Sequence, residues 1–302
     1  MLTLRQIRYF ETLARTLHFG RAAKILHISQ PALSAQIAQM EAFFGTTLFS
    51  RMSGGVALTA DGELVGERVK RILAEVNDLE GFAARGKATL SGRMRVGMIA
   101  TVAPYLLPHL LEHLADHYPD LDCEVRESVT DRLLTDLNRG EIDCAIVALP
   151  LEEQGLEALP LFDDPFLLAA PAAIADRLPD PFPPALLGNE RIILLEEGHC
   201  LRSQALDVCR LAGGHELATL GATSLTTVLR MVAGGLGATL IPKIAVTDET
   251  RGGGIAILPF QDPAPFRRLV LVFRPTTARL PDLKAFAEAV VEAHDRALSR
   301  ED

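Results

Sequence analysis

Apolar residues recur at helical intervals through the first part of the chain. Leu4, Ile7, Phe10, Leu13 and Leu17 follow the spacing of one helix face and predict a helix over 4–17. A short second helix is expected over 20–26, and a tight turn at 27–28 should lead into a third helix. The chain therefore begins with closely spaced helices that can pack into one small domain.

The third helix has sequence signals at both of its ends. Ser29 suits the N-cap position, Pro31 falls in the first turn, where a missing N–H has no consequence, and Gly45 suits the position after the last turn. Two short helices joined by a tight turn, the second well capped, are typical of a helix-turn-helix. The apolar face of the third helix consists of Leu33, Ile37, Met40 and Phe44.

A long amphipathic helix is predicted next, over 59–87. Asp61 and Glu63 are favourably placed in its first turn, and at 1.5 Å per residue its length is roughly 43 Å. Such a helix is poorly stabilised alone, so we expect it to pair with a second copy of the chain; packing on its own domain is the alternative. Its narrow apolar seam consists of Val65, Val69, Ile72, Val76, Leu79 and Ala83.

From Gly92 onward the pattern changes to alternating strands and helices. This rhythm predicts an α/β fold with parallel sheets covered by helices, in two lobes. The strand near 269–273 and a final helix over 281–299 should return to the first lobe and leave two crossovers as a hinge. Strands are predicted over 94–99, 121–127, 144–148, 166–170, 191–195, 216–220, 238–241 and 269–273.

Charge is distributed unevenly along the 302 residues. Residues 1–60 carry six Lys or Arg against two Asp or Glu, whereas the whole chain has a net charge of −9. A basic head on an acidic body is typical of a DNA-binding domain joined to a domain that does not contact DNA. The sequence shows neither an apolar run of the ~18 residues that a membrane span needs nor a signal peptide, so we expect a cytoplasmic protein without membrane contact.

Residues 10–62 contain an ordered set of motifs that resembles the head of LysR-type bacterial transcription regulators. The set comprises Phe10-Glu11, Phe19-Gly20-Arg21-Ala22-Ala23, Ser29-Gln30-Pro31-Ala32-Leu33-Ser34, Ile37, Met40-Glu41, Gly45, Leu48-Phe49, Arg51, Leu58-Thr59 and Gly62. The rest of the chain resembles the peroxide-sensing members of that family. The motifs there are Thr101-Val102-Ala103-Pro104-Tyr105-Leu106-Leu107-Pro108, Gly198-His199-Cys200-Leu201-Arg202 with Cys209 nine residues on, Ala222-Thr223-Ser224-Leu225 and Met231-Val232-Ala233.

The resemblance implies a winged helix-turn-helix over 1–58, a linker and dimerisation helix over 59–90, and a regulatory domain over 91–302 similar to periplasmic binding proteins. Lobe I would comprise about 91–163 and 268–302, and lobe II about 164–267. It implies a homodimer or homotetramer on promoter DNA that activates oxidative-stress genes with RNA polymerase. Hydrogen peroxide would be the signal and glutaredoxin or thioredoxin the thiol reductant. No enzymatic activity, cofactor or metal is expected.

DNA contacts are expected from one face of the third helix and from the wing. Gln30, Ser34 and Ala35 point away from the apolar face; glutamine can pair with adenine, serine can donate or accept, and alanine can touch a thymine methyl. Pro31 lies on the same first turn. In the wing, Arg51 and Ser53 are candidates for phosphate or minor-groove contacts. Without the family pattern, these side chains could equally be ordinary solvated surface.

Four cysteines are present, and none has the C-x-x-C spacing of a zinc site. Cys123 and Cys144 lie in apolar strand patterns and are expected to be inert core residues. Cys200 and Cys209 bracket a helical pattern that would hold their Cα atoms roughly 13–14 Å apart. A disulfide needs about 7 Å or less, so bonding would require that segment to unfold. By spacing alone, two buried side chains without a redox role are the alternative.

The resemblance implies that Cys200 is the peroxidatic thiol and Cys209 the resolving thiol. A helix N-terminus with His199 and Arg202 nearby would favour the reactive thiolate. Thr101 and Thr130 follow the first two strands, where α/β proteins bind ligands, and they would hold the peroxide. Thr130 also suits a helix N-cap. Two other functions stay open: a regulator with an organic effector in the inter-lobe cleft and incidental cysteines, and a thiol peroxidase with an appended helical domain.

Overall fold

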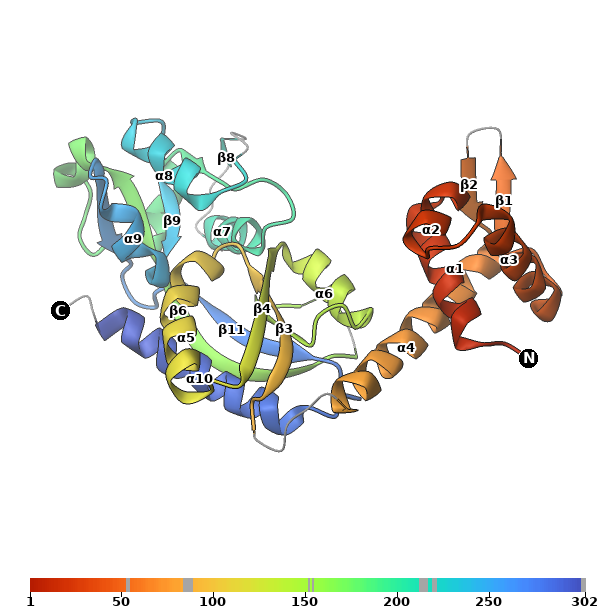
Figure 1. Ribbon diagram of the computed structural model, residues 1–302. Helices are drawn as coiled ribbons and strands as arrows, with labels where there is room; N and C mark the ends of the chain where they lie inside the picture. Colours follow the sequence, from red (N-terminus) through yellow and green to blue (C-terminus); the bar gives the residue numbers. More distant parts are fainter. Residues whose placement is uncertain are drawn as a thin grey trace. The chain divides into compact units, whose positions relative to one another are not determined.

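The computed structural model describes residues 1–52, 55–83, 89–151, 153, 155–211, 217–218 and 222–299. The chain divides into two compact units. The first comprises Met1–Ala83 with Asn138–Glu141, and the second comprises Ala84–Leu137 with Ile142–Asp302. Figure 1 shows the helical first unit and the α/β second unit.

The first unit is a winged helix-turn-helix followed by a long helix. Its elements are α1 (Leu4–Thr16), α2 (Phe19–Ile25), α3 (Gln30–Phe44), the antiparallel hairpin β1 (Phe49–Met52) and β2 (Gly55–Leu58), and α4 (Ala60–Ala83). The predicted ends of the third helix are confirmed, because the Ser29 side chain accepts the Ala32 N–H and Gly45 is left-handed with φ 72°. Phe10, Leu13 and Leu33 are fully buried in the core of this unit.

The wing contacts the helices at two places, one by hydrogen bonds and one by tight packing at a glycine. Glu41 on α3 accepts the backbone N–H groups of Leu48 and Phe49 on one carboxylate oxygen, at 2.8 and 3.2 Å. At Gly62 on α4, a Cβ atom would lie 2.1 Å from the Leu48 carbonyl oxygen, so only glycine fits there. The motif residues Glu41 and Gly62 therefore fix the wing geometrically.

The apolar seam of α4 serves two surfaces. Val69 is 3% exposed and belongs to the core of its own unit, whereas Ile72 and Leu79 are 42% and 69% exposed. The first half of the seam thus packs on its own domain, as the alternative interpretation held. The exposed residues leave apolar surface on α4 to which a partner helix could bind.

The second unit is built on a mixed sheet. Strands β3 (Gly92–Ile99), β4 (Leu121–Ser128) and β5 (Cys144–Ala148) are parallel to one another, as predicted. The strands that follow pair antiparallel, so the expectation of wholly parallel sheets is wrong there. They are β6 (Glu157–Pro171), β9 (Thr239–Pro242), β10 (Ile255–Pro259) and β11 (Phe266–Phe273), in the order β10-β6-β11-β5-β3-β4 with β9 also on β6.

The long strand β6 joins the two lobes. Its first part, 157–165, pairs with β11 in lobe I, and its second part, from Phe166 on, pairs with β9 and β10 in lobe II. One strand therefore supplies the first of the two predicted crossovers, and the chain between β10 and β11 supplies the second. Only the apolar second part of β6 was predicted, because its first part is largely exposed and carries no clear apolar run.

Helices cover the sheet in both lobes (Figure 1). In lobe I, α5 (Ala103–His117) packs against α10 (Leu280–Ser299), and α6 (Thr130–Asn138) leads into β5. None of the helices within the described ranges combines the length and the apolar character needed to cross a membrane. The remaining elements are η1 (Ala172–Arg177), η2 (Pro184–Asn189), β7 (Ile192–Ile193), α7 (Cys200–Leu211), β8 (Leu217–Ala218), α8 (Leu225–Ala233), η3 (Lys243–Ala245) and α9 (Val246–Thr250).

One strand of lobe II is shorter than the apolar pattern predicted, and another is described only in part. The segment expected over 191–195 is a strand only at β7, and the one expected over 216–220 is described only at β8, because its other residues lie outside the described ranges. β7 and β8 pair with each other in parallel. In the sequence, α7, the helix that bears Cys200 and Cys209, lies between them.

Candidate functional site

A small hollow lies where three segments of the regulatory unit meet. It is lined by the end of β3 at Ile99, Ala100 and Thr101, and by the start of α7 at His199 and Cys200. Its third side is the turn from β4 into α6, at Ser128, Val129 and Thr130. The hollow therefore faces the carboxyl ends of two parallel strands, where ligands bind in α/β folds.

Cys200 and Cys209 lie on the same helix. Cys200 is half-buried as the first residue of α7, and Cys209 is 3% exposed near its end; both are free thiols. Nine residues of regular helix place their Cα atoms about 13 Å apart along the axis. Burial raises the pKa of the Cys209 thiol. In this state the two sulfur atoms cannot bond without a change in the helix.

Thr101 is held by a buried arginine that the sequence patterns did not single out. Arg267, at the start of β11, donates to the Thr101 hydroxyl at 2.7 Å and to its carbonyl oxygen at 3.0 Å. The same guanidinium pairs with Asp164 on β6 at 2.9 Å, and both side chains are completely buried. The other Asp164 oxygen accepts the Ile244 N–H at 3.2 Å. The pair thus supports one wall of the hollow from behind.

This arrangement determines what Thr101 can do. Because Arg267 donates to the hydroxyl oxygen, the hydroxyl proton stays available to donate to an acceptor in the hollow. The site therefore has a hydrogen-bond donor backed by a buried cation. The signal in the sequence was weak: Asp164 directly follows Asp163 and Arg267 directly precedes Arg268, so neither buried residue stands out in its strand.

Thr130 supplies an unpartnered hydroxyl. It lies inside α6, whose first helical residue it is, so the expectation that it caps a helix beginning at Asp131 is wrong. Within the described part of the chain, its Oγ1 is buried and has no hydrogen-bond partner. Buried polar atoms are rarely left unpaired, so the Thr130 hydroxyl is a candidate contact for a small polar ligand.

His199 and Arg202 have different positions relative to the hollow. His199 is half-buried and lines it beside Cys200. The Arg202 guanidinium donates to the Leu195 carbonyl oxygen at 2.9 Å. Arg202 therefore fastens the first turn of α7 to the segment that precedes it, so its contact is structural.

The expected DNA-reading residues lie on the outer face of α3. Gln30, Pro31 and Ala35 are exposed and Ser34 is half-buried, whereas Leu33 beneath them is fully buried. In the wing, the backbone of Arg51 on β1 pairs with that of Val56, and Ser53 lies outside the described residues. The first two turns of α3 thus leave Gln30 and Ala35 exposed and Ser34 partly exposed on the face opposite Leu33, as a recognition helix requires.

These features define a class: a DNA-binding transcription regulator with a winged helix-turn-helix and a two-lobed α/β regulatory domain. Comparison with family models agrees, with residues 4–63 matching the bacterial regulatory helix-turn-helix protein of the lysR family and residues 87–295 matching the LysR substrate binding domain. The chain belongs to the LysR family.

Within that family the chain is similar to regulators of the peroxide response. It is 42% identical to a probable hydrogen peroxide-inducible genes activator of Streptomyces viridosporus, over 96% of this chain and 94% of the relative. It is 39% identical to the DNA-binding transcriptional dual regulator OxyR of Escherichia coli K12, over 96% and 95%.

Solved structures lead to the same group of regulators. A full-length OxyR variant from Pseudomonas aeruginosa superposes with a TM-score of 0.77 at 34% identity, over 96% of this chain and 95% of that one. A hydrogen peroxide-bound OxyR mutant from Corynebacterium glutamicum superposes with a TM-score of 0.68 at 35% identity, over 98% and 96%. Both units therefore have the folds found in full-length OxyR.

Proposed function

We propose that this chain senses hydrogen peroxide through a reversible disulfide between Cys200 and Cys209 and thereby controls oxidative-stress genes. One observation carries the proposal: the half-buried thiol of Cys200 and the unpartnered hydroxyl of Thr130 line the same hollow. A peroxide molecule is small, and it both donates and accepts hydrogen bonds. The peroxide-inducible relatives support the same signal.

The first chemical step is attack by the Cys200 thiolate on one peroxide oxygen. An S–O bond forms, the O–O bond breaks, and the departing hydroxide takes a proton and leaves as water, so Cys200 becomes a sulfenic acid. Thr101 would donate to a peroxide oxygen and Thr130 would accept from the other peroxide hydroxyl. His199, beside Cys200, would complete the site. Arg267, itself held by Asp164, would keep the Thr101 hydroxyl proton turned toward the leaving oxygen.

The second step is resolution by Cys209. Its sulfur attacks the Cys200 sulfur, an S–S bond forms, the S–O bond breaks and a second water leaves. Because the helix holds the two residues about 13 Å apart, α7 has to unwind first. The Arg202 contact with Leu195 would guide that change at the start of the helix. A dithiol reductant such as glutaredoxin or thioredoxin would return two electrons and restore both thiols.

The signal would reach DNA through the first unit. Gln30, Ser34 and Ala35, with Pro31 beside them, would read base edges in the major groove, and Arg51 and Ser53 of the wing would contact the backbone. The exposed apolar residues of α4 would pair two copies, and two dimers would form a tetramer on promoter DNA in the bacterial cytoplasm, in contact with RNA polymerase. In this proposal, residues 59–90 form the linker and dimerisation helix between the DNA-binding and regulatory domains. The boundaries between lobe I and lobe II lie near residues 164 and 267.

The proposal is tested by mapping thiols by mass spectrometry before and after a small dose of peroxide, together with DNase footprints on the region upstream of the protein's own gene. The wild-type protein should form a Cys200–Cys209 linkage and change its footprint. Cys200→Ser should do neither, and Cys123→Ser, a matched control on β4, should do both. A Cys200→Ser protein that keeps its inducible response would contradict the redox mechanism and support an organic effector. Sustained peroxide turnover without DNA binding would indicate an enzyme.

A further inference from the structure

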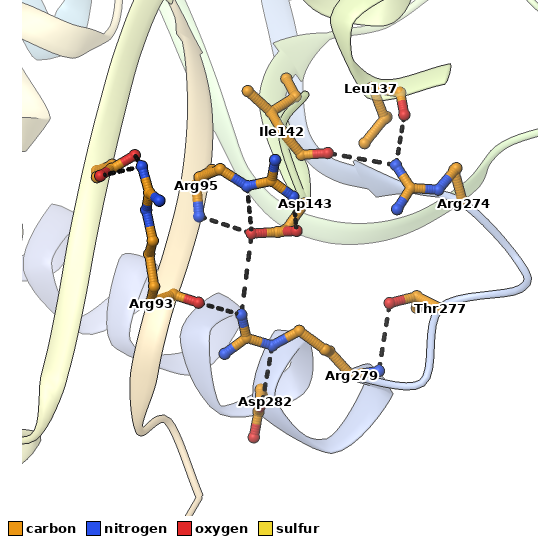
Figure 2. A network of polar contacts seen from close by, with 10 residues as sticks. Arg93, Arg95, Leu137, Ile142, Asp143, Arg274, Thr277, Arg279 and Asp282 are labelled. Atoms are coloured by element: carbon orange, nitrogen blue, oxygen red, sulfur yellow. Dashed lines mark hydrogen bonds and ion pairs between the residues drawn. The ribbon is translucent and has the colours of Figure 1, made fainter. Parts of the chain in front are cut away.

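A buried polar network holds the short segment through which the chain enters the regulatory unit. Arg279 donates to the Arg93 carbonyl oxygen at 2.6 Å and to the Ser91 carbonyl oxygen at 3.5 Å. Asp282, in the first turn of α10, pairs with the Arg279 Nε at 3.1 Å and accepts the Leu90 N–H at 3.2 Å. Figure 2 shows Arg279 reaching toward the backbone of β3 and toward Asp282. We call Arg279, Asp282 and the backbone of residues 90–93 the linker anchor.

The anchor holds a strained backbone conformation. Leu90 has φ +53°, in the left-handed region that non-glycine residues rarely adopt, and it is 1% exposed. The Arg279 and Asp282 side chains are each 9% exposed. A residue keeps such a conformation only where its surroundings hold it there, and such strain gathers at switch regions. The end of α4 at Ala83 is only seven residues before Leu90 in the sequence.

Two more arginines extend the network to β5 and α6. Asp143, directly before β5, lies 3.8 Å from Arg279 and is bound by both the backbone and the guanidinium of Arg95, with contacts from 2.7 Å (Figure 2). Arg274, directly after β11, donates to the carbonyl oxygens of Leu137, at the end of α6, and of Ile142. The anchor is thus joined to the ends of several elements of lobe I.

The same elements reach the candidate redox site at their opposite ends. β3 runs from the anchor to the Thr101 wall over eight residues, roughly 26 Å. Arg267 is the second residue of β11, and Arg274 directly follows its last residue. α6 begins at Thr130, and the Leu137 carbonyl that Arg274 contacts lies near its other end. A shift of Thr101 or Thr130 is therefore carried by paired strands and a helix to the residues that hold the linker.

We propose that Arg279 and Asp282 are positioning residues that couple the oxidation state of the Cys200 site to the linker helix and so to DNA binding. The inference rests on the proposed function. Oxidation changes the hollow, the elements of lobe I shift against the anchor, and the strained residue Leu90 re-aims the chain that leads to α4. Such coupling requires an element with two arrangements that both sites can bias, and the left-handed turn at Leu90 would be that element.

The test compares Asp282→Asn and Arg279→Gln with wild type in the full-length protein. Asp282→Asn keeps the shape of the side chain, so it covers the case in which Arg279→Gln fails to fold. Arg93→Ala is the matched control, because that side chain is 63% exposed and pairs with Glu124 at the surface, while its carbonyl group remains. Each protein is assayed for the rate of Cys200–Cys209 formation and for the ratio of DNA affinities in the disulfide and thiol states, on the region upstream of its own gene.

The anchor variants should form the disulfide within about twofold of the wild-type rate, while the affinity ratio between the two states moves toward one by about fivefold or more. Arg93→Ala should match wild type in both measurements. Anchor variants that oxidise normally and keep the full affinity ratio would overturn the inference, as would variants that fail to form the disulfide. A wild-type protein that forms no disulfide would overturn the proposed function, and this inference with it.

Discussion

Cys200 and Cys209 stand at the beginning and near the end of a single unbroken helix, both as free thiols. The first is half-buried at a hollow with unsatisfied polar lining, and the second is buried in the core with a raised pKa. The helix therefore keeps apart two sulfur atoms that lie in different environments.

Replacing Thr130 with valine should separate ligand binding from stability. The Thr130 hydroxyl has no protein partner within the described chain, so Thr130→Val should leave the free energy of unfolding unchanged or raise it by up to about 1 kcal/mol. Oxidation of Cys200 by peroxide should slow by about tenfold, since one hydrogen bond to the peroxide is lost. Urea unfolding and timed thiol trapping measure the two effects.

Thr135→Val is the control for that variant. Thr135 lies on the same helix, but its hydroxyl donates to the Asp131 carbonyl oxygen at 2.8 Å and does not line the hollow. Its oxidation rate should equal that of wild type. Equal rates for Thr130→Val and wild type would contradict the role assigned to Thr130.

Asp164→Ala should strongly destabilise the regulatory unit. It leaves the fully buried Arg267 without its carboxylate partner, and breaking a buried pair in this way costs about 3–5 kcal/mol. Asp163→Ala is a control one residue away, because Asp163 pairs with Arg268 at the surface, where the two side chains are 45% and 52% exposed. Denaturant unfolding should show a large shift for Asp164→Ala and almost none for Asp163→Ala; similar shifts would refute the buried role.

The four thiols should react with iodoacetamide at different rates in the reduced protein. Burial raises the pKa of Cys209, raises that of Cys123 to about 11, and raises that of Cys144 well above its ordinary value. A raised pKa leaves less thiolate at pH 7.5, by tenfold for each unit. Cys200 should therefore be labelled first, and all four should react alike after denaturation. Labelling of Cys209 or Cys144 at the rate of Cys200 would contradict the burial described.

Stability should fall below about pH 6.5 because of His294. This histidine of α10 stacks on Phe162 with ring centroids 3.7 Å apart, and burial lowers its pKa, although Asp164 and Asp295 oppose the shift and Lys243 adds to it. The unfolded chain takes up the proton near pH 6.5 and the folded chain only at lower pH. Stability is therefore full above pH 6.5 and is lost toward the folded pKa, by at most about 1.4 kcal/mol per pH unit for one proton.

His294→Gln should flatten that dependence. Urea unfolding of both proteins at pH 7.5 and pH 5.5 measures it, with the difference between the two pH values smaller in the variant. The same difference in wild type and variant would show that another group titrates in this range.

The sequence predicted the elements whose signals are local. Ser29, Pro31 and Gly45 mark the ends of α3 by caps and turn conformations that involve only a few neighbouring residues, and the helix between the two cysteines has a regular apolar face. The Thr101 and Thr130 segments were located because they follow apolar strands directly. Local chemistry and the order of motifs were sufficient for these parts of the candidate site.

The features that were missed depend on residues distant in sequence. Arg267 and Asp164 are 103 positions apart, and nothing in either strand alone shows that they meet behind Thr101. The antiparallel direction of β11 is set by where the chain returns to the sheet, which no apolar pattern records. The anchor likewise joins Leu90 to Asp282, 192 positions away. Such pairings follow from the tertiary fold, so the sequence could suggest only that each polar residue needs a partner.

We propose that the disulfide forms only when α7 unwinds. Hydrogen exchange of peptides covering 200–211, measured by mass spectrometry before and after one equivalent of peroxide, tests it most directly. We predict that amide protection across this segment falls by at least about tenfold in the disulfide-bonded protein and stays unchanged in peroxide-treated Cys209→Ser. A Cys200–Cys209 bond in a protein whose α7 amides remain fully protected would contradict the account.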